Sequence, residues 1–188
     1  MITTLKLLRF LGPTLLFFGT FVVLPPLLMS YLNNALDNNM LWVYLSCITY
    51  SLIILLTLRR KKFSYTPRDG FIITFFTWVL ISVLASLPFL INSLTFYDAL
   101  FEAVSGLTTT GSTVIKDLSL LPDHVLLYRQ LLQWSGGVGL VIVVLAIIPA
   151  VSGGMKVLQA ETSGFADKSF SPRLRETARS LLKFYVLI

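Results

Sequence analysis

The residues best suited to chemistry lie together in the run Thr108-Thr109-Thr110-Gly111-Ser112-Thr113, called the hydroxyl loop below. This loop offers hydroxyl and peptide oxygens and carries no charged side chain. Oxygen ligands suit hard cations, and a set without carboxylates suits a monovalent ion such as K⁺. Gly111 can adopt backbone conformations that a Cβ would forbid, which would let neighbouring carbonyl groups face one axis. The loop therefore predicts a site where backbone oxygens replace the water around an alkali cation.

Reactive side chains of other kinds are scarce. The sequence has one Cys and one His, Cys47 and His124, and neither is expected to have a role because one of each cannot form a disulfide or a metal cluster. Asp98 and Glu102 could act as an acid and base pair, but no catalytic nucleophile or histidine accompanies them. The chain also holds no G-x-S-x-G or H-E-x-x-H motif. The residues therefore predict that the chain is not an enzyme.

The composition indicates that the elements holding this loop lie in a membrane. Of the 188 residues, 55% are hydrophobic and 13% are charged, and the mean hydropathy is +0.81. A soluble fold has about 25% charged residues, so this chain cannot cover a soluble surface. The balance excludes a disordered chain, a disulfide scaffold and a nucleic-acid module, even with a net charge of +6.

Four apolar stretches approach the ~20 residues that a helix needs to cross a bilayer. The predicted spans are Leu11–Leu32, Leu41–Leu58, Phe71–Ile91 and Gln130–Ile148. A short polar turn joins the first two, which predicts a helical hairpin. The expected fold class is therefore an all-α polytopic membrane protein.

The cationic residues are concentrated on one side of these spans. Of the 15 Lys and Arg residues, only Lys116 and Arg129 lie between the third and fourth spans. By the positive-inside rule, the N-terminus is cytoplasmic. The run Arg59–Lys62 could also contact anionic lipid or nucleic acid, but the topology alone accounts for it. Membrane lipid is therefore an expected partner, and nucleic acid is not.

The segment between the third and fourth spans is too regular for a simple external loop. Thr95 and Asp98 fit the capping pattern [ST]-x-x-[DE], and Phe96–Leu107 has the pattern of a helix of about twelve residues, or ~18 Å. Such a helix crosses half a bilayer, so we expect it to be re-entrant, with the hydroxyl loop at its inner end and Val114–Asp123 returning outward. The C-terminal end of the short helix would favour a cation. The alternative is a polar turn in an external loop, which composition alone favours and the order of elements disfavours.

Three charged residues near the loop have two interpretations each. Asp98 and Glu102 attract cations or complement the N-terminus of the short helix, and capping is favoured for Asp98. Arg129 either pairs with Glu102 and braces the loop or extends to the membrane interface, and the second interpretation is favoured. Small residues leave one face of the fourth span bare, which predicts close helix packing rather than a hinge. These residues are Ser135, Gly136, Gly137 and Gly139.

The run from Phe101 to Thr113, with the sequence FEAVSGLTTTGST, resembles the first pore loop of the Trk/Ktr/HKT family of potassium transporters, in particular its TrkH type. The likeness spans most of the chain. It continues in Tyr128-Arg129-Gln130, Gln133-Trp134, Gly136-Gly137-Val138-Gly139, Gly153-Gly154-Met155, Ala160-Glu161-Thr162 and Pro172-Arg173.

The resemblance implies two accessory helices followed by four helix–pore loop–helix repeats, and uptake of K⁺ across the bacterial inner membrane. K⁺ would be the transported ion, held by a filter of backbone oxygens. The resemblance also implies a homodimer and a cytoplasmic nucleotide-binding regulatory subunit, which Arg173–Lys183 could contact. Thr109 and Thr110 would be K⁺ ligands. The other implied residues are Gly111 and Ser112 in the filter, and Thr108, Thr113, Glu102 and Arg129 in its support.

The chain is expected to divide into three parts. Residues 1–69 form an accessory transmembrane hairpin with a basic loop, residues 70–150 form the first helix–pore loop–helix repeat, and residues 151–188 form a linker and the start of a further helix. Ser171 and Pro172 resemble the N-terminus of that helix. From Leu181 the chain covers only ~12 Å, so it is expected to stop inside a span.

One pore loop is about a quarter of a filter, so transport is expected to need further repeats. Two alternatives remain open. The chain could be a truncated, non-conducting membrane fragment or assembly piece, or this single repeat could form a homotetrameric pore.

Overall fold

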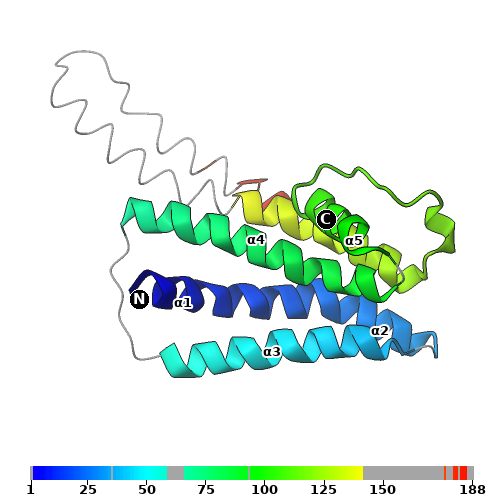
Figure 1. Ribbon diagram of the computed structural model, residues 1–188, viewed down its shortest axis with the longest axis horizontal. Coiled ribbons are helices and arrows are strands. Elements are labelled where there is room, and N and C mark those ends of the chain that lie inside the picture. The colour runs from blue at the N-terminus through cyan, green and yellow to red at the C-terminus, as the bar shows by residue number, and fades with distance from the viewer. Residues whose placement is uncertain are drawn as a thin grey trace, which may run out of the picture.

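The computed structural model describes residues 2–34, 36–58, 66–92 and 94–141, with residues 176, 180, 181 and 183–185. Across these ranges every regular element is helical, as the sequence predicts (Figure 1). A helix over residues 123–141 follows the elements α1 (Ile2–Phe17), η1 (Phe18–Val23), α2 (Leu24–Leu32), α3 (Asn38–Leu58), α4 (Pro67–Ile91), α5 (Phe96–Leu107) and η2 (Leu118–Leu120).

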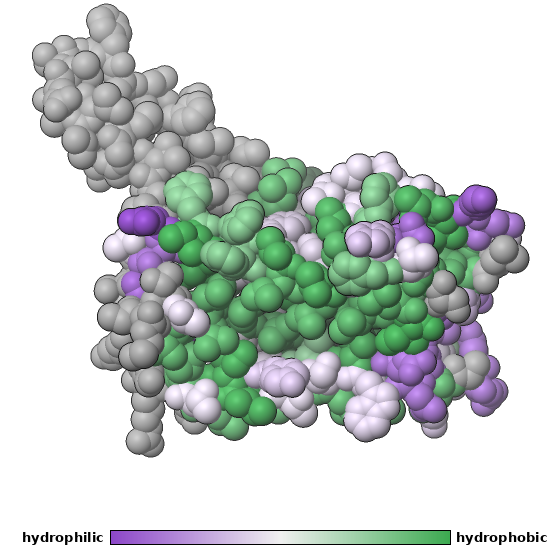
Figure 2. All heavy atoms as spheres, in the orientation of Figure 1, coloured by the Kyte–Doolittle hydropathy of each residue, from purple (hydrophilic) through white to green (hydrophobic). Residues whose placement is uncertain are grey.

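Three of these helical stretches are long and apolar enough to cross a membrane. They are Thr4–Leu32, Asn38–Leu58 and Arg68–Ile91, in agreement with the first three predicted spans. Figure 1 shows α3, α1 and α4 lying side by side. In Figure 2 the middle of the visible face is a hydrophobic band, and hydrophilic residues gather at its two ends. This is the surface expected of a bundle whose solvent is lipid.

The first span is longer than predicted because its prolines do not break it. α1, η1 and α2 follow one another without a gap, and the wide turns of η1 come directly before Pro25 and Pro26 at the start of α2. A proline has no amide to donate, so the preceding turns must satisfy their carbonyls in other ways. Within η1, the Thr20 hydroxyl also donates to the Leu16 carbonyl, at 2.7 Å.

The helix that contains the start of the fourth predicted span begins before that span. It starts at residue 123 rather than at Gln130, because the Pro122 carbonyl accepts from the amides of Val125 and Leu126 at 2.9 and 3.1 Å. Residues 142–148 of that span lie outside the described residues, as do the linker motifs from Gly153 to Arg173.

The short helix between the third and fourth spans is present. α5 has 12 residues, and the Thr95 hydroxyl accepts from the Asp98 amide at 3.3 Å and donates to the Asp98 carboxylate at 2.7 Å. Asp98 therefore belongs to the cap of α5, which was the favoured interpretation. On the return path, the hydroxyl and amide of Ser119 bond Asp117, and these bonds lower the pKa of Asp117.

One ion pair and one His–Asp contact fasten the hairpin of α1–α2 and α3 to the rest of the fold. Lys6 bonds Asp69 at 2.8 Å, and Asp69 also closes the capping box of α4 with Thr66. At the other end, His124 lies 3.2 Å from Asp37, whose second carboxylate oxygen accepts from two amides at the start of α3. The expectation that His124 has no role is therefore wrong, because it joins the helix over residues 123–141 to the hairpin turn.

Candidate functional site

The end of α5 lies deep in the bundle, against a glycine of the neighbouring helix. A Cβ placed on Gly136 would lie 2.0 Å from the Leu107 carbonyl oxygen and 3.0 Å from the Leu107 Cα. The predicted close packing at this small-residue face is therefore present. Gly136 follows the start of its helix at residue 123 by about three and a half turns, so Leu107 lies ~20 Å inward from that start.

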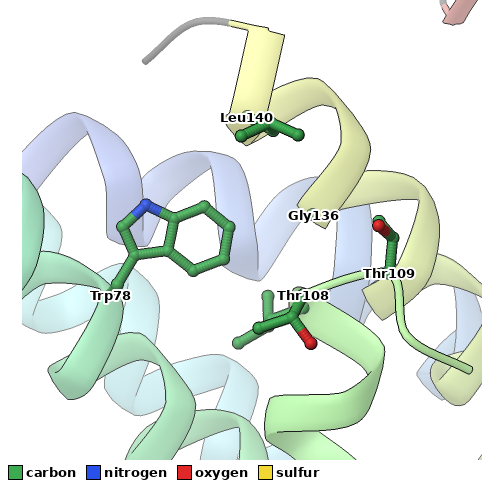
Figure 3. A pocket seen from close by; sticks show the side chains of 6 residues that line it. Trp78, Thr108, Thr109, Gly136 and Leu140 are labelled. Carbon is green, nitrogen blue, oxygen red and sulfur yellow. The ribbon is translucent and has the colours of Figure 1, made fainter. Parts of the chain in front are cut away.

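A cavity next to the hydroxyl loop independently indicates how far into the bundle the loop begins. The cavity has a volume of about 210 Å³ and is lined by Trp78, Leu107, Thr108, Thr109, Gly136 and Leu140. Figure 3 shows Trp78 and Leu140 around the space that Thr108 and Thr109 border. Trp78 lies ~20 Å from the end of α4 at Ile91, since each helical residue adds 1.5 Å. The loop therefore begins near the middle of the long helices.

The amides of the hydroxyl loop turn back onto α5. The amides of Thr110 and Gly111 both donate to the Ser105 carbonyl, at 3.0 and 3.3 Å. The Thr109 amide donates to the Gly106 carbonyl at 2.9 Å, and the Thr108 amide donates to the Val104 carbonyl at 2.8 Å. Successive amides can converge on one acceptor when left-handed residues alternate with ordinary ones. Thr109 and Gly111 are left-handed, with φ of +58° and +75°.

This arrangement divides the carbonyls of the loop into two groups. Within the described residues, the carbonyls of Thr109 and Thr110 accept no hydrogen bond, and both residues are exposed. The Gly111 carbonyl accepts from Arg129 at 3.2 Å, and the Ser112 carbonyl accepts from the Ser105 hydroxyl at 2.6 Å. Of the four residues expected to bind the ion, two thus have unengaged carbonyls and two are held by side chains.

A buried ion pair holds the outer part of the loop. Arg129 Nε donates to Glu102 at 2.9 Å, and the two side chains are 10% and 0% exposed. The other Glu102 oxygen accepts from the Thr113 hydroxyl at 2.5 Å and from the Val114 amide at 2.8 Å. The interpretation of Arg129 as a residue extending to the membrane interface is therefore wrong. The pair joins α5, the segment that follows the hydroxyl loop and the helix over residues 123–141.

The remaining hydroxyls stabilise the turn itself. The Thr108 hydroxyl donates to the Val104 carbonyl and lies 2.9 Å from the Thr110 hydroxyl. In the part of the chain that the structure describes, no three His, Cys, Asp or Glu side chains gather into a metal site. The loop thus offers neutral oxygens, as the sequence predicts.

Two features of the site were not predicted from the sequence. Ser105 accepts two loop amides with its carbonyl and bonds the Ser112 carbonyl with its hydroxyl, so the loop folds around it. The sequence signal for this role was the position of Ser105, a small hydroxyl residue near the C-terminus of a mostly apolar helix. The second feature is the positive φ of Thr109, because a β-branched residue in that conformation is a genuine outlier. Such outliers persist where surrounding bonds hold them in place and are common at functional sites.

Known proteins similar to this chain are transporters. The Trk system potassium uptake protein TrkH of Salmonella typhimurium is 35% identical over 185 residues, covering 96% of this chain and 38% of the relative. The corresponding protein TrkG of Escherichia coli is 44% identical over 137 residues, covering 70% of this chain and 28% of the relative. The crystal structure of the potassium transporter TrkH from Vibrio parahaemolyticus matches with a TM-score of 0.73 at 32% identity, covering 97% of this chain and 37% of that one.

This chain spans less than half the length of these relatives. The family model of TrkH, described as a cation transport protein, matches residues 38–188, which include α3, α4, α5 and the hydroxyl loop. Because that match covers most of the sequence, the chain belongs to the TrkH family of cation transport proteins, which are transporters and not enzymes.

Proposed function

We propose that this chain is part of a potassium uptake protein of the bacterial inner membrane and that its hydroxyl loop supplies one of four pore loops. One observation carries the proposal: the Thr110 and Gly111 amides both bond the Ser105 carbonyl, while the Thr109 and Thr110 carbonyls accept no hydrogen bond among the described residues. Peptide oxygens that accept no hydrogen bond can replace the water of an alkali ion. The names of the relatives support K⁺ as that ion.

In this proposal K⁺ loses water at the loop and no covalent bond changes. The carbonyls of Thr109 and Thr110 are the main ligands. Those of Gly111 and Ser112 each accept one hydrogen bond and keep a second lone pair for the ion. The C-terminal end of α5 carries partial negative charge, which favours a cation at this depth. The cavity beside Thr109 receives the ion on its inward path.

The Glu102–Arg129 pair and Ser105 would act as supports. They bond the Gly111 and Ser112 carbonyls and the Val114 amide. Carbonyls fixed in advance need no rearrangement when the ion loses its water, so ligand positions stay matched to one ion size. These supports would therefore affect selectivity as well as rate.

The proposed orientation places the N-terminus in the cytoplasm, as the distribution of Lys and Arg indicates. All six residues of the hydroxyl loop are exposed, which suits a surface that further pore loops would complete. The competing candidate, a non-conducting membrane piece, has the same exposed loop but would carry no ion. Uptake measurements on the intact protein separate the two.

Changing Gly111 to Ala should lower rubidium uptake by the intact protein about tenfold, because a left-handed non-glycine residue costs about 1–2 kcal/mol. The new Cβ would also lie 2.8 Å from the Gln133 amide nitrogen, which must move. Uptake into cells that lack other potassium transporters measures the effect, and membrane insertion should stay intact.

The control for this variant is Gly70→Ala. A Cβ at Gly70 meets nothing within 4 Å, so the uptake rate should stay at the wild-type value. If Gly111→Ala transports rubidium as well as Gly70→Ala does, the loop is not the filter.

Changing Ser105 to Ala should weaken discrimination between ions. The variant loses the bond to the Ser112 carbonyl, and one such bond contributes about 1 kcal/mol, or about fivefold. We expect excess Na⁺ to inhibit rubidium uptake at about fivefold lower concentration than in wild type. Ser135→Ala is the matched control, since within the described ranges the Ser135 hydroxyl bonds only its own helix, at the Leu132 carbonyl. Equal sodium inhibition of both variants would contradict the supporting role of Ser105.

A further inference from the structure

The cavity beside the hydroxyl loop has features that the passage of K⁺ alone does not explain. Its volume is about 210 Å³, and an apolar cavity of ~150 Å³ is enough to hold benzene. Only two of its six lining residues, Thr108 and Thr109, have hydroxyl groups, and none has a charged side chain. An alkali ion gains nothing from an apolar wall, so the rest of the lining needs a separate explanation.

Trp78 forms one wall of this cavity. Figure 3 shows its ring extending from α4 toward the space between Leu140 and Thr108. A Cβ on Gly139 would lie 3.6 Å from the Trp78 ring, so the indole reaches the helix over residues 123–141. The ring therefore contacts both helices beside the cavity. The face of a Trp ring attracts cations, and quaternary ammonium groups are commonly recognised in this way.

Backbone carbonyls at the end of α5 supply the polar part of the lining. Among the described residues, the carbonyls of Leu107, Thr108 and Thr109 accept no hydrogen bond. Leu107 is buried and its carbonyl oxygen lies against Gly136, although buried carbonyls normally have a donor. The C-terminal end of a helix also carries partial negative charge. The cavity thus combines an apolar surface with a potential that favours a positive ligand.

We propose that this cavity binds a quaternary ammonium ion. The charged group lies between the Trp78 ring and the carbonyls at the end of α5, and its methyl groups contact Leu107 and Leu140. Such an ion has no N–H group and holds water weakly, so it loses less on leaving water than a compact ammonium does. It enters at Thr108 and Thr109, which are exposed. Binding depends only on these residues, whereas its effect on K⁺ uptake rests on the proposed function.

Equilibrium binding of radiolabelled choline to the purified intact protein, in buffer without K⁺, tests the inference. The neutral analogue of choline, in which a carbon atom replaces the quaternary nitrogen, should not compete. Trp78→Leu should weaken choline binding about fivefold, and Trp78→Phe should weaken it less because an aromatic face remains. Trp42→Leu is the matched control, since Trp42 is exposed on α3 and lies outside the cavity lining, and it should bind choline as wild type does.

A second variant keeps the test decisive if Trp78→Leu does not fold. Leu140 is exposed, so Leu140→Trp should fill the cavity without disturbing the core, and it should lower choline binding in protein that elutes normally from a sizing column. No choline binding by wild type, equal competition by the neutral analogue, or unchanged binding in folded Trp78→Leu or Leu140→Trp would each overturn the proposal.

Rubidium uptake separates this site from the proposed ion path. Choline should inhibit uptake by wild type, and Leu140→Trp should be less sensitive to it. If choline binds with the expected dependence on Trp78 and leaves uptake unchanged, the binding site stands and the ion path lies elsewhere.

Discussion

Changing Glu102 to Gln is expected to lower potassium uptake by the intact protein about a hundredfold or more. The Glu102 side chain is fully buried, with Arg129 on one carboxylate oxygen and Thr113 and Val114 on the other. A neutral amide leaves the Arg129 charge buried without its counterion, which costs about 3–5 kcal/mol. That cost falls on the hydroxyl loop and the residues just after it, so the loop should lose its fixed geometry before the bundle unfolds.

The matched control for Glu102 is Asp98→Asn, one turn earlier on the same helix. Among the residues that the structure describes, the Asp98 side chain bonds only Thr95 at the cap, so uptake should stay within about threefold of wild type, as expected for a weakened cap. The double variant Glu102→Gln with Arg129→Gln removes both charges and should regain part of the activity. Rubidium uptake near the wild-type rate in Glu102→Gln alone would refute the supporting role.

Changing Gly136 to Ala should prevent α5 from docking, with loss of most folded protein as well as of uptake. The added methyl group would lie 2.0 Å from the Leu107 carbonyl oxygen. Because Leu107 meets it with backbone atoms, no change of side-chain rotamer can relieve the clash. Overpacking of a well-packed contact typically costs about 1–3 kcal/mol, and a backbone clash lies at or above the upper end of that range. The fraction that elutes as a single species in detergent measures the loss.

Gly139→Ala provides the comparison for Gly136. Its Cβ would meet the Trp78 ring at 3.6 Å, an ordinary contact, so this variant should fold and transport as wild type does. The two substitutions are chemically identical and lie on the same helix. If both variants yield the same amount of folded protein, then α5 is not held at the depth described here.

Local features of the fold could be predicted from the sequence. The apolar lengths of the first three spans, the Thr95 cap and the extent of Phe96–Leu107 depend on residues close together in the chain, so pattern rules apply to them. The positive φ of Gly111 was likewise expected because only the absence of a Cβ makes that conformation inexpensive.

Contacts between distant residues could not be predicted in the same way. Glu102 and Arg129 are 27 residues apart, and Lys6 and Asp69 are 63 apart. From the sequence alone, membrane topology accounts for Lys6 and a position at the membrane interface accounts for Arg129. Only the packing of the helices shows that each cation meets a carboxylate. The positive φ of Thr109 was missed for a related reason, since a β-branched residue disfavours that conformation and its backbone is set by the bonds that hold its neighbours to α5.

The Lys6–Asp69 ion pair and the Asp37–His124 contact, at the two ends of the hairpin, restrict how this repeat can deform. Lys6–Asp69 ties α1 to the start of α4, and Asp37–His124 ties the turn to the start of the helix over residues 123–141. A piston-like translation of α4 or of the helix over residues 123–141 along the bundle axis would break one of these links. A tilt of either helix about its linked end would leave both links intact. Shape changes in this part of the protein are therefore confined to pivoting and bending.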